Sequence, residues 1–151
     1  MEKVLRKHLP GGGFTNVPEK RSRTMAAVRG KGNRTTERRL RCALAAAGIR
    51  GWKMHPYDIP GCPDFWFPRA RLAVFVDGCF WHGCPKCGHL PRTNAAFWKA
   101  KFERNKARDR RVTRRLRQQG VAVIRIWECQ IRAERAQYLL RIRRALIRRS
   151  T

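Results

Sequence analysis

The sequence predicts one α/β domain in which helices flank a small mixed β-sheet. The first observation is the length of 151 residues, which suits a single hydrophobic core. The second is a pair of apolar runs, LAVFV at 72–76 and VAVIRIW at 121–127, which are typical of buried strands. The third is a helical pattern before, between and after these runs. The expected order is helix, strand, strand, helix, strand, helix, without internal repeats.

The first helix is predicted to begin at Thr35 or Thr36, either of which can act as its N-cap, and to run through Ala47 before Gly48 ends it. Leu40, Ala43, Leu44 and Ala47 lie on one face at helical spacing. This face is expected to pack on the core.

Two adjacent strands are expected after this helix. DFWF at 64–67 and LAVFV at 72–76 are separated by the turn sequence PRAR. Because the second strand is apolar at every position, both of its faces should be buried, which places it in the centre of the sheet. The run at 121–127 is predicted to be a third buried strand.

A long basic helix should connect the second and third strands. It is predicted to begin near Thr93 or Asn94 and to stop at Gly120, and its lysines and arginines far outnumber its acids. A closing helix covers about 132–149. Its core-facing positions are predicted to be Ala136, Leu139, Ile142 and Leu146.

The N-terminal segment differs in composition from the rest. Residues 1–33 are rich in Gly, Lys and Arg and show little periodicity. GGG at 11–13 and RGKGNR at 29–34 favour a flexible chain when no partner is bound. Residues 1–20 are therefore predicted to be a flexible basic extension, and RSRTMAAV at 21–28 could form one or two helical turns.

The charge of the chain points to a polyanionic partner. Lysine and arginine number 36 against 10 acidic residues, so the formal net charge is +26 and the pI is near 11.6. Such a surface repels itself unless a polyanion neutralises it, which favours nucleic acid over a merely solvated basic face. The aromatic residues are scattered rather than aligned on one amphipathic helix, which argues against a membrane surface. No apolar run reaches the roughly 18–20 residues of a membrane span and no signal peptide is visible, so a cytoplasmic location is expected.

The cysteine spacing indicates a metal site. Cys79, Cys84 and Cys87 follow the pattern C-x4-C-x2-C, and Cys129 comes directly after the third predicted strand in the tripeptide WEC. The three thiols at 79, 84 and 87 cannot all find disulfide partners among themselves, and cytosolic cysteines are more often ligands or free thiols. Four thiolates suit a tetrahedral zinc ion without an open position, which would hold the fold rather than do chemistry.

Two alternatives to this set of ligands remain open. His82 or His89 could replace one thiol, or some of the cysteines could be ordinary buried residues. Cys42 and Cys62 stand alone in the sequence and are interpreted as structural.

Two aspartates are candidates for a metal-dependent reaction. PGCPDF at 60–65 places Asp64 at the start of a strand, and Asp77 ends the next strand. Neighbouring strands can bring both carboxylates to one end of the sheet, where they suit a Mg²⁺ ion that polarises a phosphodiester. Pro-Asp followed by (Asp/Glu)-x-Lys is the signature of one nuclease superfamily, but Cys79 stands at the lysine position here. His82 is the natural substitute, because histidine can take a proton from water near neutral pH.

Several segments resemble the very-short-patch repair endonucleases (Vsr). They are RSRTMAAVRGKGNRTTERRL, PGCPDF, VFVDGCFWHGCPKC, TNAAFWKAKFERNKARDRR and VAVIRIWEC, and the resemblance covers about residues 21–131. The resemblance implies a PD-(D/E)xK, restriction-endonuclease-like core with a structural zinc, in one domain at 21–151. It also implies a monomer that nicks DNA on the 5′ side of the thymine in a T·G mismatch left by deamination of 5-methylcytosine.

The same resemblance implies roles for individual residues. Asp64 would bind Mg²⁺ together with the backbone carbonyl of Val76. His82 would activate the attacking water, and Glu37 would orient that water or the histidine. Asp77 stands where the best-known members have histidine, and an acid there matches in kind the superfamily's usual second metal ligand. The zinc positions match Cys79, Cys84, Cys87 and Cys129, which leaves His82 for catalysis.

Aromatic residues would recognise the mismatch. Phe80, Trp81 and Trp98 match side chains that the family wedges into the base stack beside the mismatch. Stacking on a base contributes about 1–3 kcal/mol, and a mismatched step is easier to unstack than a paired one. Without the resemblance, the more usual interpretation of these side chains is core packing.

The segment 21–34 is expected to be an arm that contacts DNA. Met25 and Val28 match residues that the family inserts from the opposite groove, and apolar wedges of this kind open base steps. From the sequence alone they would be a helix face and nothing more.

Two other functions remain possible at this stage. One is a zinc-stabilised nucleic-acid-binding protein without catalytic activity, for which the charge alone would be sufficient. The other is a nuclease of the same fold with a different DNA substrate, such as unmodified duplex. Against the first stands the coincidence of Glu37, Asp64, Asp77 and His82 at positions that a nuclease needs.

Overall fold

The computed structural model describes residues 36–133 and 135–149. Its elements are α2 (Thr36–Ala46), β1 (Lys53–Met54), β2 (Phe65–Phe67), β3 (Leu72–Asp77), α3 (Ala95–Gln118), β4 (Ala122–Trp127), α4 (Glu128–Ala133) and α5 (Arg135–Ile147). The predicted α/β class with a small mixed sheet is confirmed. The expected basic extension and DNA-contacting arm, with Met25 and Val28, lie outside the described residues, as does Thr35.

The sheet has four strands in the order β1-β2-β3-β4. The β1–β2 and β2–β3 pairs are antiparallel, whereas β3 and β4 are parallel. A parallel pair needs a long crossover between its strands, and α3 provides it. The prediction that 72–76 is central is confirmed, because β3 has a neighbour on each side.

The third predicted strand is correct in position but not in burial. β4 pairs only with β3, and Ile126 is its one fully buried residue. The other β4 residues are half-buried, because β4 lies at the edge of the described sheet. The two-residue strand β1 was not predicted, since two residues carry no readable alternation.

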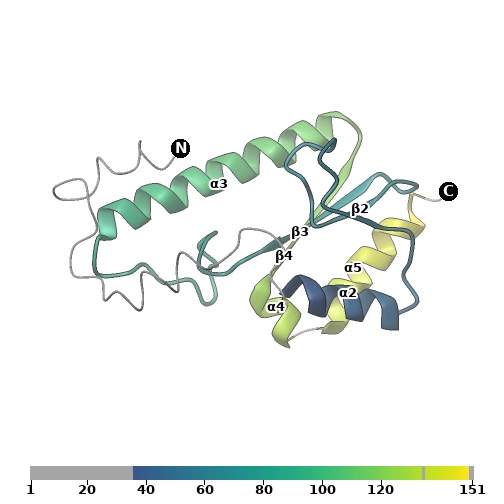
Figure 1. Cartoon of the computed structure of the whole chain (residues 1–151), viewed down its shortest axis with the longest axis horizontal. Coiled ribbons are helices and arrows are strands. Elements are labelled where there is room, and N and C mark those ends of the chain that lie inside the picture. Colours follow the sequence, from purple (N-terminus) through teal and green to yellow (C-terminus); the bar gives the residue numbers. More distant parts are fainter. Residues whose placement is uncertain (1–35, 134, 150–151) are drawn as a thin grey trace.

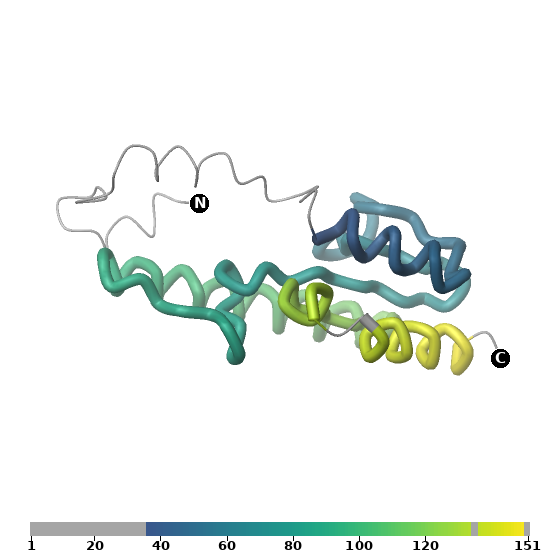
Figure 2. The backbone as a smooth tube through the Cα atoms, turned by 90° about the horizontal axis from the view of Figure 1, so that it is seen from below, coloured from purple at the N-terminus to yellow at the C-terminus, as the bar shows by residue number. Residues whose placement is uncertain are grey.

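Helices cover both faces of the sheet (Figure 1). α2, α4 and α5 pack on one face, and α3 runs along the other, as the turned view also shows (Figure 2). Side chains of β3 point alternately to the two faces of the sheet. Leu72 and Val74 pack on the side of α2, α4 and α5, while Ala73 and Phe75 pack on the side of α3. This alternation fixes on which face each functional residue near the end of β3 lies.

Glycines end α2 and α3 as predicted. Gly48 and Gly120 adopt left-handed backbone angles, with φ of 70° and 73°. After α3, the amide of Gly120 donates to the Arg117 carbonyl, and that of Val121 to the Leu116 carbonyl. This pattern is a Schellman motif, which needs a residue that tolerates positive φ. It turns the chain directly into β4.

The closing helix differs from the prediction of one helix at about 132–149. α4 already begins at Glu128, where the side chain of Gln130 accepts a hydrogen bond of 3.0 Å from the Trp127 amide. This contact caps the first turn of α4, and α5 follows from Arg135. Tyr138 and Ile142 are the buried residues of α5, while Ala136 is exposed, contrary to its predicted role in packing.

The loop before β2 is fitted closely to α3. Gly61 has a φ of 80°, and a Cβ atom built on it would clash with Cγ1 of Val112. Cys62 also has a positive φ, of 49°. The PGCPD turn is therefore held against α3, and it delivers Asp64 to the edge of the sheet. Among the described residues, none of the helices has the length and apolar character needed to cross a membrane.

Candidate functional site

The residues suited to acid–base or metal chemistry form three groups around the C-terminal end of β3. In each group the possible ligand atoms lie within 4.8 Å of one another. The groups are Glu37, His55 and Asp64; Asp77, His82 and Asp109; and Cys79, Cys84, Cys87 and Cys129. We call them the Asp64 group, the His82 group and the thiol group.

In the Asp64 group, three segments far apart in sequence meet. Glu37 lies buried in the first turn of α2, and Asp64 immediately precedes β2. The amide of Val76 donates a 2.7 Å hydrogen bond to Oδ2 of Asp64. Nε2 of His55 lies 2.9 Å from Glu37 Oε2 and 3.6 Å from Asp64 Oδ1.

The electrostatics of the Asp64 group favour a bound cation. Burial raises the pKa of Asp64 to about 6, and the carboxylates of Glu37 and Asp77 contribute to the rise, although the Val76 amide and His55 oppose it. The two carboxylates lie close together around one imidazole, and the charge of Glu37 disfavours the ionised form of Asp64. A divalent metal with oxygen ligands would stabilise this arrangement.

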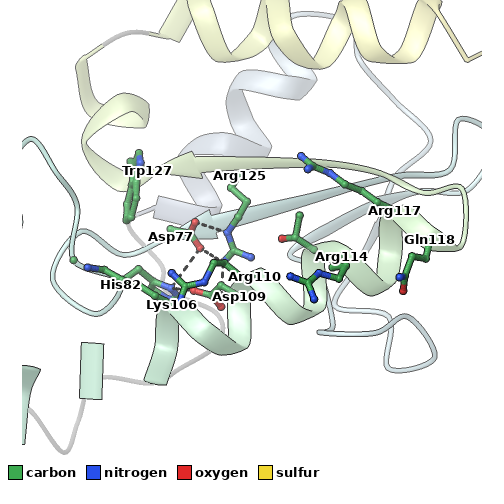
Figure 3. Close-up of a pocket in the computed structure, with 12 residues that line it drawn as sticks. Asp77, His82, Lys106, Asp109, Arg110, Arg114, Arg117, Gln118, Arg125 and Trp127 are labelled. Atoms are coloured by element: carbon green, nitrogen blue, oxygen red, sulfur yellow. Dashed lines mark hydrogen bonds and ion pairs between the residues drawn. The ribbon is translucent and has the colours of Figure 1, made fainter. Parts of the chain in front are cut away.

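In the His82 group, one carboxylate holds the histidine and another is held by an arginine (Figure 3). Nδ1 of His82 lies 2.5 Å from Oδ2 of Asp109, on α3. Asp77 is only 4% exposed and accepts two hydrogen bonds from Arg125, at 2.7 Å from Nε and 2.5 Å from Nη2. The same Nη2 lies 3.3 Å from Oδ1 of Asp109.

These contacts favour the ionised form of Asp109. Burial alone would raise the pKa of Asp109. The hydrogen bond to His82 and the charge of Arg125 nevertheless hold this pKa below its ordinary value. Asp77 forms a bidentate pair with Arg125 and lies 3.7 Å from His82. It therefore belongs to the His82 group and not to the Asp64 group. The geometry thus gives Asp77 a neutralising partner, which it shares with Asp109.

A cavity of about 840 Å³ opens beside the His82 group (Figure 3). One wall is the sheet and the other is a basic face of α3. The lining consists of Asp77, His82, Gly83, Lys106, Asp109, Arg110, Thr113, Arg114, Arg117, Gln118, Arg125 and Trp127. Lysine and arginine residues outnumber acidic residues in this lining, so the cavity suits an anionic group such as a phosphate.

The thiol group brings together all four predicted cysteines. Sγ of Cys84 lies 3.8 Å from Sγ of Cys129, and the Cys129 amide donates to Sγ of Cys79 at 3.3 Å. All four are free thiols rather than disulfides. Against the effect of its burial, backbone amides of Lys86 and Cys87 lower the pKa of Cys84 to about 7. Burial raises the pKa of Cys79, so this group can hold a metal but cannot ionise fully without one.

No histidine replaces a thiol in this group. His82 is bonded to Asp109, and the exposed His89 has its ring centroid 5.7 Å from that of Phe80. Cys42 is exposed on α2, and Cys62 is half-buried in the turn before Asp64. The alternative of a histidine ligand is therefore not what the structure shows.

The predicted aromatic residues form a partly exposed cluster. Ring centroids of Phe80 lie 5.2 Å from Trp81 and 5.0 Å from Trp98. All three are half-buried, and they rest on the buried Phe102 and Phe97. The cluster therefore packs on these two buried rings and leaves part of its own surface exposed, and stacking on DNA bases stays a prediction.

Sequence reasoning missed three residues of these groups: His55, Asp109 and Arg125. A single histidine before a proline carries no spacing signal, and neither does one of the two acids in a basic helix. The φ of 48° at His55 is visible only in the structure. For Arg125 there was a signal, since a charge interrupts the apolar run VAVIRIW.

Comparison with known proteins places these groups in context. The family profile described as "DNA mismatch endonuclease Vsr" matches residues 13–87. The chain is 41% identical over 116 residues to the type II nicking enzyme V.XorIIP of Xanthomonas oryzae pv. oryzae, which covers 76% of this chain and 83% of that protein. It is 43% identical over 112 residues to the type II nicking enzyme V.NaeI of Lentzea aerocolonigenes, covering 72% and 67%. The DNA mismatch endonuclease Vsr of Escherichia coli (strain K12) is 35% identical over 114 residues, covering 74% and 71%.

The pKa of Asp109 leads to a pH-dependent prediction. Asp109→Asn should lower the free energy of unfolding near pH 7 by about 1–3 kcal/mol, because a hydrogen bond to a charged group is lost. A carboxylate with a depressed pKa stabilises the fold above its ordinary pKa of 3.8 and loses that effect as the pH falls through its lower value in the folded state. The difference between wild type and variant should therefore shrink in acid. Urea unfolding at several pH values measures it, with the exposed Asp58→Asn as control. A difference independent of pH would contradict this account.

Proposed function

Because the chain belongs to the Vsr family of DNA mismatch endonucleases and is a DNA endonuclease, we propose that it nicks duplex DNA on the 5′ side of the thymine in a T·G mismatch. The reaction would use Mg²⁺ and act in very-short-patch repair of deaminated 5-methylcytosine. The observation that carries the proposal is that Asp64 is bonded to Val76 at the end of β3, where the next residue, Asp77, lies 3.7 Å from a histidine that Asp109 holds in place. Family membership excludes the alternative of a binding protein without catalytic activity.

The arrangement supports a PD-(D/E)xK core. Asp64 follows a proline and directly precedes β2, and Asp77 ends the neighbouring strand β3. This is where that superfamily carries its acids. The superfamily's lysine position holds Cys79, which belongs to the thiol group, so another residue must assist the attacking water.

The Asp64 group fits a divalent cation. Oδ2 of Asp64 accepts the Val76 amide hydrogen, and Oδ1 lies on the side of His55. In a strand, the N–H and C=O of one residue point to the same side, so the Val76 carbonyl is expected toward Asp64 as a further oxygen donor. When bound, Mg²⁺ would supply Lewis-acid polarisation of the scissile phosphodiester.

His82 is suited to accept a proton from water. Asp109 holds Nδ1 of His82 in the orientation where it donates, which leaves Nε2 as the basic nitrogen. Asp109 also stabilises the imidazolium that forms. The Arg125 guanidinium neutralises Asp77, so that this second carboxylate does not compete as a proton acceptor. Glu37 would act from the Asp64 group, by orienting the water.

The thiol group fits a structural zinc ion. Sulfur atoms at the corners of a tetrahedron with bonds of about 2.3 Å lie about 3.8 Å apart. The distance between Cys84 and Cys129 is 3.8 Å. Four thiolates leave no open position, so the zinc would hold the loop after β3 to the start of α4 rather than activate water.

DNA would bind across the basic face of α3 and the aromatic cluster. Arg110 and Arg114 line the cavity next to His82 and would contact backbone phosphates. Phe80, Trp81 and Trp98 would stack on bases beside the mismatch, with Lys101 above the rings of Trp81 and Trp98. Phosphate contacts position the enzyme, and stacking would discriminate the mismatch.

The first test concerns the metal ligand. Asp64→Asn should reduce Mg²⁺-dependent nicking of a T·G duplex by more than about 100-fold. Mutating residues that only hydrogen-bond to metal ligands already lowers metal affinity or activity by about 10–100-fold. Binding to the same duplex should remain or tighten, because a negative charge near phosphate is removed. The labelled substrates are one T·G duplex, one fully paired duplex and other mismatches, each with and without Mg²⁺. Asp58→Asn, an exposed acid on the same loop, is the control and should nick normally.

Two results of this test would contradict the proposal. Near-normal nicking by Asp64→Asn would place the metal elsewhere. Equal nicking of paired and T·G duplexes by the wild type would assign the nuclease to another DNA substrate.

The second test concerns zinc. Freshly purified protein should contain one zinc per chain, and Cys129→Ser should lose it. If the metal contributes about 3 kcal/mol to folding, its loss should lower Tm by about 6–12 °C for a chain of this size. Cys42→Ser, which changes an exposed cysteine on α2, should keep both zinc and Tm. Elemental analysis and thermal unfolding measure the two quantities, and wild-type protein without zinc would refute the assignment.

The third test separates recognition of the mismatch from general affinity. Trp81→Ala should reduce the preference for T·G over paired duplex by about 1–3 kcal/mol, since it removes stacking but no charge. Arg114→Gln should weaken binding to both duplexes alike, because it removes a phosphate contact. Equilibrium binding to both duplexes gives the ratio. If Trp81→Ala weakens both equally, the aromatic cluster is a general platform and does not read the mismatch.

A further inference from the structure

His55 has no assigned role, yet its imidazole lies in the middle of the Asp64 group. Nε2 is buried and lies 2.9 Å from Oε2 of Glu37, but among the described residues it makes no hydrogen bond of normal geometry. The two atoms are close without being aligned for donation. A buried nitrogen in this condition needs another partner.

The backbone of His55 supports a specific role. Its φ of 48° is left-handed, although it is not glycine and Pro56 follows it. Such a conformation is disfavoured for residues with a side chain and persists where the surrounding structure requires it. Here it places the imidazole between two carboxylates from different segments.

The spacing of the donor atoms matches that of ligands around one ion. Adjacent ligands of an octahedral ion with bonds of about 2.1 Å lie about 3 Å apart. Nε2 of His55 lies 2.9 Å from the Glu37 oxygen and 3.6 Å from Oδ1 of Asp64. Oδ2 of Asp64 is already bonded to the Val76 amide, which leaves Oδ1 for this side.

We propose that His55 is a ligand of the catalytic metal through Nε2, in a centre formed with Glu37 and Asp64. The inference rests on the proposed metal-dependent function and adds a nitrogen donor to it. It also makes Glu37 a direct ligand rather than a residue that orients water. Carboxylates and water suit Mg²⁺ and Mn²⁺ alike, whereas an imidazole favours transition metals over Mg²⁺. The centre should therefore bind Mn²⁺ more tightly than Mg²⁺.

The experiment measures metal binding directly, with Mn²⁺ as the probe. Zinc-loaded, DNA-free protein is titrated with Mn²⁺ by electron paramagnetic resonance, and Mg²⁺ affinity is obtained by competition. Pulsed measurements then detect coupling between bound Mn²⁺ and a ¹⁴N nucleus. His55→Ala removes the donor, and His55→Gln replaces it with an amide oxygen. His89→Gln, which changes an exposed histidine outside the group, is the control for metal binding.

The wild type should show ¹⁴N coupling, and His55→Ala should lose it and bind Mn²⁺ at least about tenfold more weakly. His55→Gln should lose the coupling and lower the ratio of Mn²⁺ to Mg²⁺ affinity. Zinc content and Tm without divalent metal show that each variant is folded. If His55→Ala is unfolded, His55→Gln alone decides. Its ratio of Mn²⁺ to Mg²⁺ affinity and the ¹⁴N coupling of its bound Mn²⁺ are still measurable.

Failure of this inference is distinguishable from failure of the proposed function. If the wild type binds Mn²⁺ and nicks T·G duplex but shows no ¹⁴N coupling, His55 is not a ligand and the inference alone is refuted. The same holds if His55→Ala binds Mn²⁺ with unchanged affinity. If the wild type neither binds Mn²⁺ nor nicks with any divalent metal, both the centre and the proposed function are refuted.

Discussion

The parallel pairing of β3 with β4 is the contact on which the rest of the site depends. Parallel strands end at the same edge of the sheet, and here Asp77 lies opposite Trp127 in the last register pair. Two residues beyond this pair stand Cys79 and Cys129, and the amide of Cys129 donates to the sulfur of Cys79. The register therefore brings two of the four cysteines of the thiol group together as a direct extension of the ladder. The pairing also demands a crossover, and the crossover helix α3 supplies Asp109.

Charge explains how carboxylates can be buried in this region. Burying a charge is costly unless a partner stabilises it. In a chain with 10 acids and 36 cations, each buried acid can acquire a cationic partner. Asp77 has Arg125, and Asp109 has both His82 and Arg125. Asp64 and Glu37 meet around His55, and this group, like the His82 group, has possible ligand atoms close enough together to hold a metal ion. In the His82 group, however, Asp77 is already paired with Arg125.

The sequence was sufficient for the framework of the fold because its signals are local. Gly48 and Gly120 end helices where positive φ is needed, and the apolar run of β3 shows that the strand is central. The break between α4 and α5 was not predictable in this way, since the cap of α4 is a side-chain contact of Gln130 that competes with a continuous helical pattern.

The same distinction applies to the site. The four cysteines carry a spacing and were found, and the structure brings them together. His55 and Asp109 become recognisable only when the loop before β2 and the middle of α3 reach the end of β3. Sequence motifs identified the residues on β3 and its flanks, whereas their partners come from elements that only tertiary packing brings near. The role of each partner follows from distances that no pattern encodes.

The geometry assigns α3 a task beyond carrying positive charge. Asp109 of α3 holds His82 on one side of the sheet edge. Three residues further along the helix, Val112 packs against Gly61, in the turn that delivers Asp64 to the other group. No side chain fits at Gly61 without displacing this contact, so the turn has little freedom to move away from the helix. In the proposed mechanism, the metal ligand Asp64 and the general base His82 would have to be held in fixed relation for an attack on one phosphodiester. One rigid helix that contacts the supports of both groups fulfils this requirement, and it does so independently of the thiol group, whose cysteines all lie outside α3.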